Sequence, residues 1–295
     1  MRRQTVRAAA YRMRHHVLNM GEAQGQGYVG QALGAADMLA TVYVDQLGYR
    51  ADDPHWADRD RFLLSTGHYA IGLYAALAEA GIIGADELET YGSDDSRLPM
   101  SGMASYTPGM EISGGSLGHG LTVAVGMALG LRHQGRSARV INFCSDGELD
   151  EGSTWEAAMG ASHHGLGNLI AMVDINALQA DGPTAGVLRT EPVADKWAAC
   201  GWHVQRVDGN DVDALLRAFD SVSTEKPSVI LCDTRIGCGV PLLETREKAH
   251  FMRIDADEWQ ICRDQLTANS PSVNPVRDPG SEFADVSHSA HGVLA

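Results

Sequence analysis

Two short polar sequences in this chain could together hold a divalent cation. One apolar run ends in Asp146 and Gly147, and thirty residues after Asp146 a second apolar run ends in Asn176. Residues 151–164 between them have helical spacing, so the pattern predicts a strand, a helix and a strand. Carboxylate and amide oxygens suit Mg²⁺, which is usually held by one or two protein oxygens together with phosphates of a substrate or cofactor. We therefore expect a site for a diphosphate that binds with its metal.

Strands and helices alternate on both sides of this segment. The expected strands are 61–65, 138–144, 168–175, 202–207 and 228–234, and the expected helices are 4–23, 35–47, 69–80, 117–133, 151–164, 191–200 and 211–221. This alternation indicates βαβ units, so the fold class is α/β, doubly wound, with a mostly parallel sheet and helices on both faces. Ligands of such sheets bind beyond the carboxyl ends of the strands, where Asp146, Asn176 and the loop after 228–234 all fall.

The chain is expected to form one domain over residues 1–268. Residues 269–295 are rich in Ser, Pro, Asp and Gly, and we expect them to be a flexible tail. Glycines punctuate residues 21–34, which predicts a loop between the first two helices. Residues 92–116 have neither helical nor strand spacing, and a loop of that length is usually functional.

The composition argues against several kinds of partner. A formal net charge of −15 over 295 residues disfavours nucleic acid and anionic membrane surfaces, because both need a basic footprint. No apolar run approaches membrane-spanning length, and the basic start is not followed by the apolar segment of a signal peptide. The five cysteines lie mostly in apolar segments, so we expect reduced thiols and a cytoplasmic protein. An anionic ligand must then be held locally, by a metal, backbone N–H groups or histidines.

The residues around the cation motif resemble the thiamine-diphosphate-binding domain of transketolase. S-D-G-E-L-D-E-G-x-x-W-E-A-A from Ser145 and D-I-N-A-L-Q-A-D-G-P-T from Asp174 follow that family's pattern of G-D-G and, one helix and one strand later, Asn. Further matching segments are S-x-G-H-x-x-x-x-L-Y from Ser65, T-P-G-x-E from Thr107, G-x-L-G-x-G from Gly115 and E-P-V-A-D-K-W-A-A-C-G-W from Glu191. The resemblance covers about residues 20–265 and is therefore specific.

The resemblance implies a set of ligands for the cofactor's diphosphate and its metal. The side chains of Asp146 and Asn176 and the backbone carbonyl of Leu178 would bind Mg²⁺, or another divalent cation such as Ca²⁺ or Mn²⁺. Gly147 would offer its N–H to the diphosphate at the start of a helix, where N–H groups and the helix dipole favour anions. Glu148, the next residue of the motif, is included among the cofactor-binding residues.

Five further positions receive a role from the same resemblance. His68 and His250 match histidines that contact the diphosphate and line the entrance, and we expect them to serve both binding and catalysis. Gly115 and Leu117 match the backbone and side chain that touch the aminopyrimidine. Glu151 matches a carboxylate at the interface between subunits that helps couple two active sites, and it is included among the catalytic residues.

Three positions depart from the family's pattern. Ser145 replaces the first glycine of G-D-G, a change that we expect to be tolerated. Tyr28 and Met103 stand where the family has histidines that contact the sugar or the reacting carbonyl. Tyr28 can still donate a hydrogen bond and is included among the catalytic residues, although an ordinary pKa of about 10 makes it a poor base. Met103 can donate nothing. We therefore expect a donor or acceptor outside the ordinary pentose-phosphate set.

The resemblance also implies a partner. Full-length transketolases carry a second domain with the glutamate that activates the aminopyrimidine, and the residues after Gln265 are too few to form it. We expect a separate transketolase C-terminal-like subunit, an α2β2 assembly, and activity only when both subunits are present. The expected reaction is that of a transferase of the transketolase type. It moves a two-carbon ketol unit from a ketose or 2-oxo donor to an aldehyde acceptor, with thiamine diphosphate and Mg²⁺ as cofactors.

Two alternatives stay open. The α subunit of a 2-oxo acid dehydrogenase or decarboxylase-type enzyme shares the metal motif and also needs a partner. The replacement of two sugar-contacting histidines is compatible with its 2-oxo acid donor. The second alternative is a non-catalytic paralogue that binds a partner. Asp146, Asn176 and His68 argue against it, because such a copy has no need of a metal site.

Overall fold

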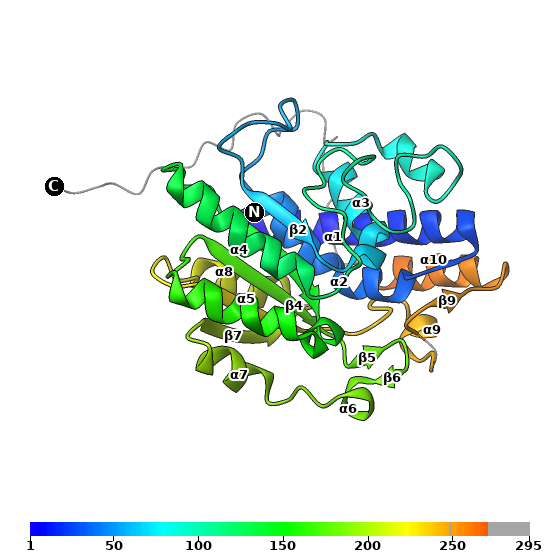
Figure 1. Ribbon diagram of the computed structural model, residues 1–295. Coiled ribbons are helices and arrows are strands. Elements are labelled where there is room, and N and C mark those ends of the chain that lie inside the picture. The colour runs from blue at the N-terminus through cyan, green and yellow to red at the C-terminus, as the bar shows by residue number, and fades with distance from the viewer. Residues whose placement is uncertain (248, 271–295) are drawn as a thin grey trace.

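A sheet of five parallel strands forms the centre of the molecule (Figure 1). The computed structural model describes residues 1–247 and 249–270, so most of the tail expected over 269–295 lies outside the described residues. The strands, in their order across the sheet, are β2 (Arg61–Leu64), β3 (Val140–Ser145), β4 (Leu169–Ile175), β8 (Ser228–Asp233) and β7 (His203–Asp208). The expected doubly wound α/β fold with a parallel sheet is confirmed.

Helices cover both faces of this sheet (Figure 1). One face carries α4 (His119–His133), α5 (Gly152–His163) and α7 (Val193–Ala199), and the other carries α1 (Arg2–Gln24), α2 (Val29–Thr41), α3 (Ala70–Glu79) and α8 (Val212–Asp220), with α10 (Glu258–Ala268) packed on α1. Alternate residues of β4 enter the two cores: Ile170 and Met172 pack with α1 and α2, while Leu169 and Val173 pack with α4 and α5. Burial on both faces explains why this strand is a continuous apolar run.

Two short antiparallel ribbons hold loops beyond the carboxyl ends of the strands. β1 (Gln26–Gly27) pairs with β9 (Met252–Arg253), and β5 (Leu178–Gln179) pairs with β6 (Gly182–Pro183). The other short elements are η1 (Val42–Gln46), η2 (Gly67–Tyr69), η3 (Ala85–Thr90), η4 (Gly147–Asp150), α6 (Thr184–Val187) and α9 (Pro241–Glu244). Because Tyr28 follows β1 and His250 precedes β9, the first ribbon brings these two residues together.

The loop expected over residues 21–34 is wrong at both ends, because α1 continues to Gln24 and α2 begins at Val29. Gly25, with a φ of 66°, ends α1, whereas the glycines of α2 serve close packing. A Cβ on Gly34 would lie 2.7 Å from the carbonyl oxygen of Arg235, and a Cβ on Gly30 would lie 2.5 Å from the Met252 side chain. These glycines therefore let the helix approach the loop after β8.

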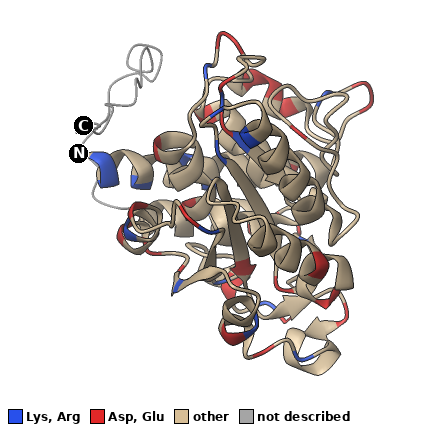
Figure 2. Cartoon of the chain, turned by 60° about the vertical axis from the view of Figure 1, so that its left-hand side comes forward, with Lys and Arg blue, Asp and Glu red and all other residues tan. Residues whose placement is uncertain are grey.

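Charged side chains are distributed over the loops and helix ends around the molecule (Figure 2). The net charge of −15 arises from 38 acidic against 23 basic residues rather than from a single run. In residues 1–247 and 249–270, no helix is both long enough and apolar enough to cross a membrane.

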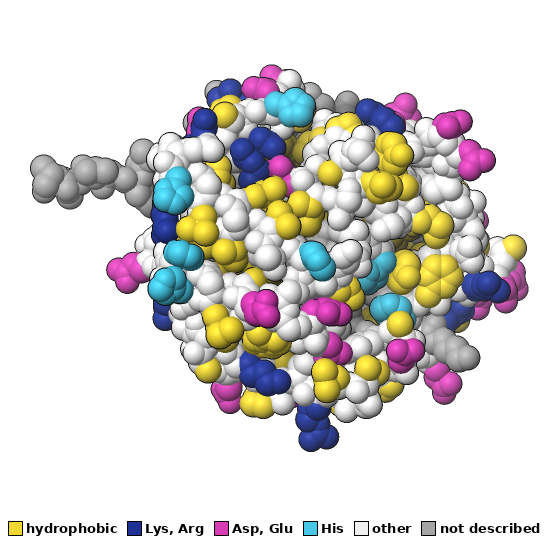
Figure 3. Space-filling view, viewed as in Figure 1, with side chains coloured by type: hydrophobic (Ala, Val, Ile, Leu, Met, Phe, Trp, Pro, Cys, Tyr) yellow, Lys and Arg dark blue, Asp and Glu magenta, His cyan; other side chains and the backbone are white. Residues whose placement is uncertain are grey.

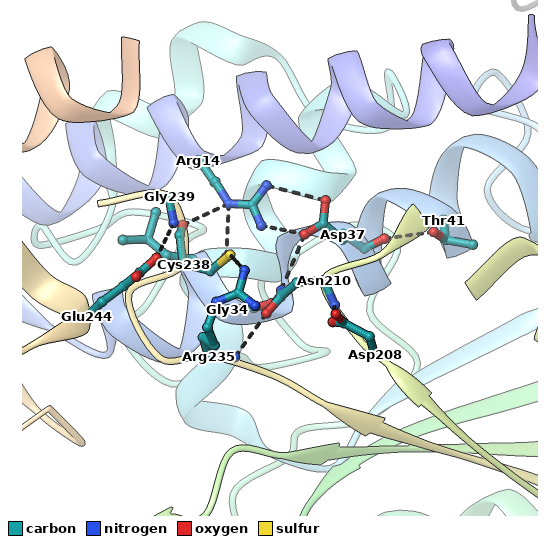
Figure 4. Close-up of polar contacts among 11 residues, drawn as sticks. Arg14, Gly34, Asp37, Thr41, Asp208, Asn210, Arg235, Cys238, Gly239 and Glu244 are labelled. Carbon is teal, nitrogen blue, oxygen red and sulfur yellow. Dashed lines mark hydrogen bonds and ion pairs between the residues drawn. The ribbon is translucent and has the colours of Figure 1, made fainter. Parts of the chain in front are cut away.

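A buried ion pair joins α1 to α2 beside the loop after β8 (Figure 4). Arg14 and Asp37 are 8% and 7% exposed, and their side chains meet at 2.5 Å. Arg14 Nε also donates to the carbonyl oxygens of Leu33 and Cys238, each at 3.1 Å. Asn210 donates to the Asp37 carboxylate at 3.3 Å. The pair thus fixes the two N-terminal helices to the sheet.

We predict that Arg14→Met lowers the free energy of unfolding by about 3–5 kcal/mol, because it leaves the Asp37 carboxylate buried and unpaired. The double variant Arg14→Met/Asp37→Leu should recover most of that loss, since no charge is then buried. Urea denaturation measures both effects. Arg136→Met is the control: it removes a pair with Asp58, which is 58% exposed, so the expected change is below about 1 kcal/mol. Equal losses for the single and double variants would contradict the interpretation.

Candidate active site

Asp146 lies at the carboxyl end of β3, beside the end of β4. Ser145 pairs with Asp174 in the sheet, and the Asp146 N–H donates to the Asp174 carbonyl oxygen at 2.9 Å. The Asp146 carboxylate is 3% exposed and accepts hydrogen bonds from Gly147 N at 2.8 Å and from Ala177 N at 2.7 Å. The two strand ends that the sequence predicts for the cation site are therefore joined by direct hydrogen bonds.

A strained turn follows Asn176. Ala177 has a φ of 62°, in the left-handed region that residues other than glycine rarely adopt. The turn points the Ala177 N–H at Asp146 and lets the Leu178 N–H donate to Asn176 Oδ1 at 3.0 Å. Strain of this kind is concentrated at binding sites. It gathers the three residues expected to bind the metal, Asp146, Asn176 and Leu178, around one short segment.

The Asn176 amide is held in one orientation. Its Nδ2 donates to Asp174 Oδ2 at 2.7 Å and to the Tyr69 hydroxyl at 2.9 Å. Tyr69 donates in turn to Asp174 Oδ2 at 2.6 Å, and the Thr234 hydroxyl donates to Asp174 Oδ1. Because the amide hydrogens are committed to this network, Oδ1 is the end that can bind a cation.

Asp146 and Asp174 are buried without a basic partner. They are 3% and 1% exposed, and within the described part of the chain neither forms an ion pair with Lys, Arg or His. Burial, and then the neighbouring Asp174, raises the pKa of Asp146 to about 7, and burial also raises the pKa of Asp174. A divalent cation would stabilise the ionised carboxylates.

The available donor atoms fit a hard cation. The described residues contain no group of three or more His, Cys, Asp or Glu that could hold a metal ion. A cation at this edge would be held by one carboxylate, from Asp146, with amide and carbonyl oxygens from Asn176 and Leu178. Such a set suits Mg²⁺, which takes few protein ligands and keeps oxygens from water or phosphate.

Glu148 connects the cation segment to the glycine-rich loop before α4. It is fully buried, and its Oε1 accepts hydrogen bonds from Gly118 N at 2.8 Å and from the Ser65 hydroxyl. Ser65 Oγ also accepts from Gly120 N at 3.1 Å. Burial raises the pKa of Glu148 to about 7. Glu148 therefore lies behind the loop and positions it, and its expected role in binding the cofactor stays a prediction.

Gly115 and Leu117 are positioned by close contact between two backbones. A Cβ on Gly114 would lie 2.2 Å from a carbonyl oxygen of β2, and a Cβ on Gly67 would lie 2.6 Å from Gly114. Gly115 has a φ of 112°, and its N–H donates to the Ser65 carbonyl oxygen at 2.8 Å. Only glycines permit this approach, so the loop is held against the carboxyl end of β2.

Four rings gather beside the cation segment. The Tyr28 ring lies 4.8 Å from His68, 5.6 Å from His250 and 5.1 Å from Phe251, between centroids. Burial, and then His250, lowers the pKa of His68 to about 4, and burial lowers the pKa of His250. Both imidazoles are therefore neutral at neutral pH. Histidine and hydrophobic side chains lie next to each other on this face, over α2 and β9 (Figure 3).

Two of the singled-out positions lie at the margin of this site. Glu151 is exposed at the N-cap of α5, and its expected role at an interface between subunits stays a prediction. Met103 is 38% exposed and follows Gly102, whose N–H donates to the Gly67 carbonyl oxygen at 3.1 Å, next to His68. The residue before Met103 is therefore joined to the turn that carries His68.

Sequence reasoning missed several residues that orient the site. Tyr69, Asp174 and Thr234 form the network around Asn176, and Thr184 donates to Asp146 Oδ2 at 3.2 Å. The sequence could have indicated a role for Asp174, because an acidic residue in a buried strand needs hydrogen-bond partners, and this one lies two residues before Asn176. No sequence spacing indicates Thr184 or Thr234, which reach the site through the folded loops.

A parallel-sheet edge with buried oxygen ligands, a glycine at the start of a helical turn and neutral imidazoles is typical of α/β proteins that hold a phosphorylated ligand through a cation. Residues 5–279 match the family described as transketolase, thiamine diphosphate binding domain, and the chain belongs to this family. The match supports the transketolase-type interpretation over the 2-oxo acid dehydrogenase alternative.

Relatives of different length share this domain. The chain is 62% identical over 253 residues to a putative uncharacterized transketolase family protein of Sinorhizobium fredii, covering 85% of this chain and 91% of the relative. It is 38% identical over 261 residues to one of the subunits of the apulose-4-phosphate transketolase of Actinobacillus succinogenes, covering 88% and 94%. The solved transketolase of Campylobacter jejuni is 28% identical with a TM-score of 0.83, covering 90% of this chain and 43% of that one. The chain thus spans less than half of the solved enzyme.

The raised pKa of Asp146 predicts pH-dependent cation binding. The cation binds the ionised carboxylate, so the affinity for Mg²⁺ with pyrophosphate should rise with pH up to about pH 7 and then level off. The sign for stability is opposite. A folded-state pKa raised above the unfolded value stabilises the chain most at low pH, and that contribution is lost as the pH rises through about 7.

Calorimetry at pH values from about 5.5 to 8.5, on either side of the Asp146 pKa of about 7, measures the affinity for Mg²⁺ with pyrophosphate. Chemical denaturation in EDTA over the same range measures the free energy of unfolding. Asp146→Asn removes the titrating carboxyl, so both the affinity and the free energy of unfolding should lose the pH dependence that comes from this residue. Asp195→Asn, at an exposed position of α7, should change neither. A cation affinity that is constant across this range in the unsubstituted chain would contradict the prediction.

Proposed function

We propose that this chain is the diphosphate- and cation-binding subunit of a two-subunit transketolase-like enzyme. The observation that supports it most is the buried Asp146 carboxylate, fixed by the N–H groups of Gly147 and Ala177 at the carboxyl edge of the sheet. The relative from Actinobacillus succinogenes, which is named as one of the subunits of a transketolase, has nearly the same extent, and this supports a split enzyme.

Each residue of the edge can perform one part of cofactor binding. Asp146, the oriented Asn176 Oδ1 and the Leu178 carbonyl would hold Mg²⁺. Gly147, at the start of η4, would donate its N–H to a diphosphate oxygen in place of its present bond to Asp146 Oδ1. Glu148 would keep the glycine-rich loop at a fixed distance from these ligands.

The rings of Tyr28, His68, His250 and Phe251 would lie near the part of the cofactor at which the substrate reacts. When bound, thiamine diphosphate supplies the carbanion chemistry, and the protein supplies orientation and exclusion of water. His68 and His250 are neutral, so they can hold or donate a proton at a ring nitrogen without adding a buried charge. Gly115 and Leu117 would orient the aminopyrimidine from the loop that Glu148 holds.

The remaining half of the site would come from a second subunit. We propose that it supplies the glutamate for the aminopyrimidine and the groups that bind the sugar phosphate, in an α2β2 assembly. Glu151 is exposed in this chain at the start of α5, so it is free to meet another subunit. The proposed reaction is transfer of a two-carbon ketol unit from a ketose or 2-oxo donor to an aldehyde acceptor.

The wall around the rings favours a donor with few hydroxyl groups. The Tyr28 hydroxyl makes no hydrogen bond within residues 1–247 and 249–270, and Phe251 and Met103 are 40% and 38% exposed without polar atoms that donate. A polyhydroxylated donor would leave some of its hydroxyls unpaired against this wall, which costs affinity. We therefore propose a donor outside the pentose phosphates.

Co-expression with a candidate second subunit tests the proposal. The complex should bind thiamine diphosphate with Mg²⁺ in calorimetry, and Asp146→Ala should weaken that binding at least tenfold, on the scale of roughly 10–100-fold seen for lost metal-site partners. Asp195→Ala, at an exposed position of α7, should leave binding unchanged. This chain alone should show negligible transfer activity, and the second subunit should restore it.

The outcomes separate the parts of the proposal. Absence of cofactor binding in the assembled complex would support the non-catalytic paralogue instead. Cofactor binding without transfer from any ketose or 2-oxo donor would keep the cofactor role and reject the transferase role. Full activity of this chain by itself would reject the split enzyme.

The substrate preference can be tested at Tyr28. Tyr28→His adds ring nitrogens that can pair with a donor hydroxyl, so kcat/KM for xylulose 5-phosphate should rise by about tenfold. The affinity for thiamine diphosphate should not change. Tyr11→His, on α1, is the matched control and should alter neither value. Ordinary transketolase rates with xylulose 5-phosphate in the unsubstituted complex would refute the proposed preference.

A further inference from the structure

One buried glutamine reaches from the start of α2 to the segment that carries His250. All 13 residues of α2 are buried, and only Gln31, Asp37 and Thr41 among them have polar side chains. Asp37 is paired with Arg14, and the Thr41 hydroxyl donates to the Asp37 carbonyl oxygen at 2.8 Å. Gln31 is 1% exposed, and its Nε2 donates to the backbone carbonyl oxygen of His250. Gln31 therefore joins the buried helix to one of the four rings beside the cation segment.

The position of Gln31 in the helix would allow a different bond. Tyr28 is the N-cap of α2, so Gln31 is the third residue of the helix. A glutamine at this position often turns back and accepts the N–H of the N-cap residue. In this chain, Gln31 Oε1 is buried and has no hydrogen-bond partner among residues 1–247 and 249–270. A buried amide oxygen without a partner costs stability, so the stability of α2 does not explain the glutamine.

The bonded carbonyl belongs to the peptide between two of the rings. Because a peptide unit is planar, a hydrogen bond to the His250 carbonyl also fixes the N–H of Phe251. The rings of His250 and Phe251 both meet the Tyr28 ring edge to face, with centroids 5.6 and 5.1 Å from it. The start of α2 thus provides the Tyr28 ring and, three residues later, the hydrogen bond that places the two rings facing it.

The two ring nitrogens of His250 differ in their surroundings. Nδ1 is buried and has no partner within the described residues, so a ligand can approach the ring only at Nε2. The direction of Nε2 depends on the backbone of residue 250, to which Gln31 is bonded. The antiparallel ribbon of β1 and β9 begins only two residues later, at Met252. The hydrogen bond from Gln31 therefore acts on the backbone of His250 itself, where the ribbon does not reach.

We propose that Gln31 is a positioning residue for the transfer reaction. It holds the peptide between His250 and Phe251, so that Nε2 of His250 points at the part of the cofactor at which the substrate reacts. The same bond keeps the Phe251 ring against Tyr28. In this role Gln31 acts through His250 and does not touch the substrate. The proposal rests on the function proposed above, but its first test does not need that function.

Nuclear magnetic resonance of the full chain tests the position of His250 directly. Histidines isotope-labelled at Cε1 give one signal per ring, and His250→Gln identifies the signal of residue 250. Gln31→Met keeps the length of the side chain but removes the donor, so this signal should shift or broaden. Gln205→Met is the matched control, because Gln205 Nε2 also donates to a backbone carbonyl oxygen, that of Ala218 at 2.9 Å, between β7 and α8. The control should leave the signal unchanged.

Kinetics of the complex with the second subunit provide a second readout. Gln31→Met should lower kcat about tenfold, because a small misplacement of a reacting group is costly, and KM for the donor should change less. The affinity for thiamine diphosphate with Mg²⁺ should stay the same, since Asp146 and Asn176 are held by other hydrogen bonds. The Tm should change little, because the lost hydrogen bond is offset by the removal of an unpaired buried oxygen.

The outcomes separate this proposal from the proposed function. An unchanged His250 signal in Gln31→Met would overturn it, and so would an unchanged kcat of this variant in an active complex. Equal losses of Tm, cofactor affinity and kcat would show a general structural role and would overturn it as well. A shifted His250 signal, in a chain whose native complex transfers nothing, would support the positioning of His250 by Gln31 and reject the proposed function instead.

Discussion

The burial of Asp146 and Asp174 at the ends of adjacent strands is the constraint on which the candidate site depends. Two carboxylates in one buried place repel each other and lose hydration, so they need compensation. Asp174 receives it from Tyr69, Asn176 and Thr234, whose hydrogen bonds surround both of its oxygens. Asp146 accepts the same number, from two backbone N–H groups and one hydroxyl. The two carboxylates differ in what their partners do: those of Asp174 also orient the Asn176 amide, so Asp174 has a structural role, and Asp146 is the carboxylate that we propose for a cation.

The rest of the edge follows from that division. Asp174 fixes the amide of Asn176, and the left-handed turn at Ala177 then directs the next N–H groups at Asp146 and at Asn176 itself. On the other side, Glu148 reaches from η4 to the backbone of the glycine-rich loop. The cation segment and the loop expected to touch the aminopyrimidine are therefore parts of one hydrogen-bonded unit.

Much of this could be predicted from the sequence because it is local. The continuous apolar runs gave the strands to within one or two residues, and the residues after them, Asp146 and Asn176, identified the sheet edge. The predictions that were wrong or missing concern contacts between segments far apart in the sequence. The pattern predicts that Gly30 and Gly34 lie in a loop, but they lie within α2, where Met252 and the Arg235 carbonyl oxygen leave no space for a Cβ. Likewise, Thr234 reaches Asp174 only when β8 pairs with β4.

The two ends of the site are held in place differently. At the cation end, backbone hydrogen bonds join the ends of β3 and β4, and the turn after β4 donates to Asp146. The ring cluster is held by the two-residue ribbon of β1 and β9 and by side chains alone. Tyr28 can replace another ring without moving the sheet, because its contacts are faces and edges of His68, His250 and Phe251. Of the positions that differ from the family pattern, Tyr28 lies in this ring cluster, whereas Ser145 ends β3 at the cation end.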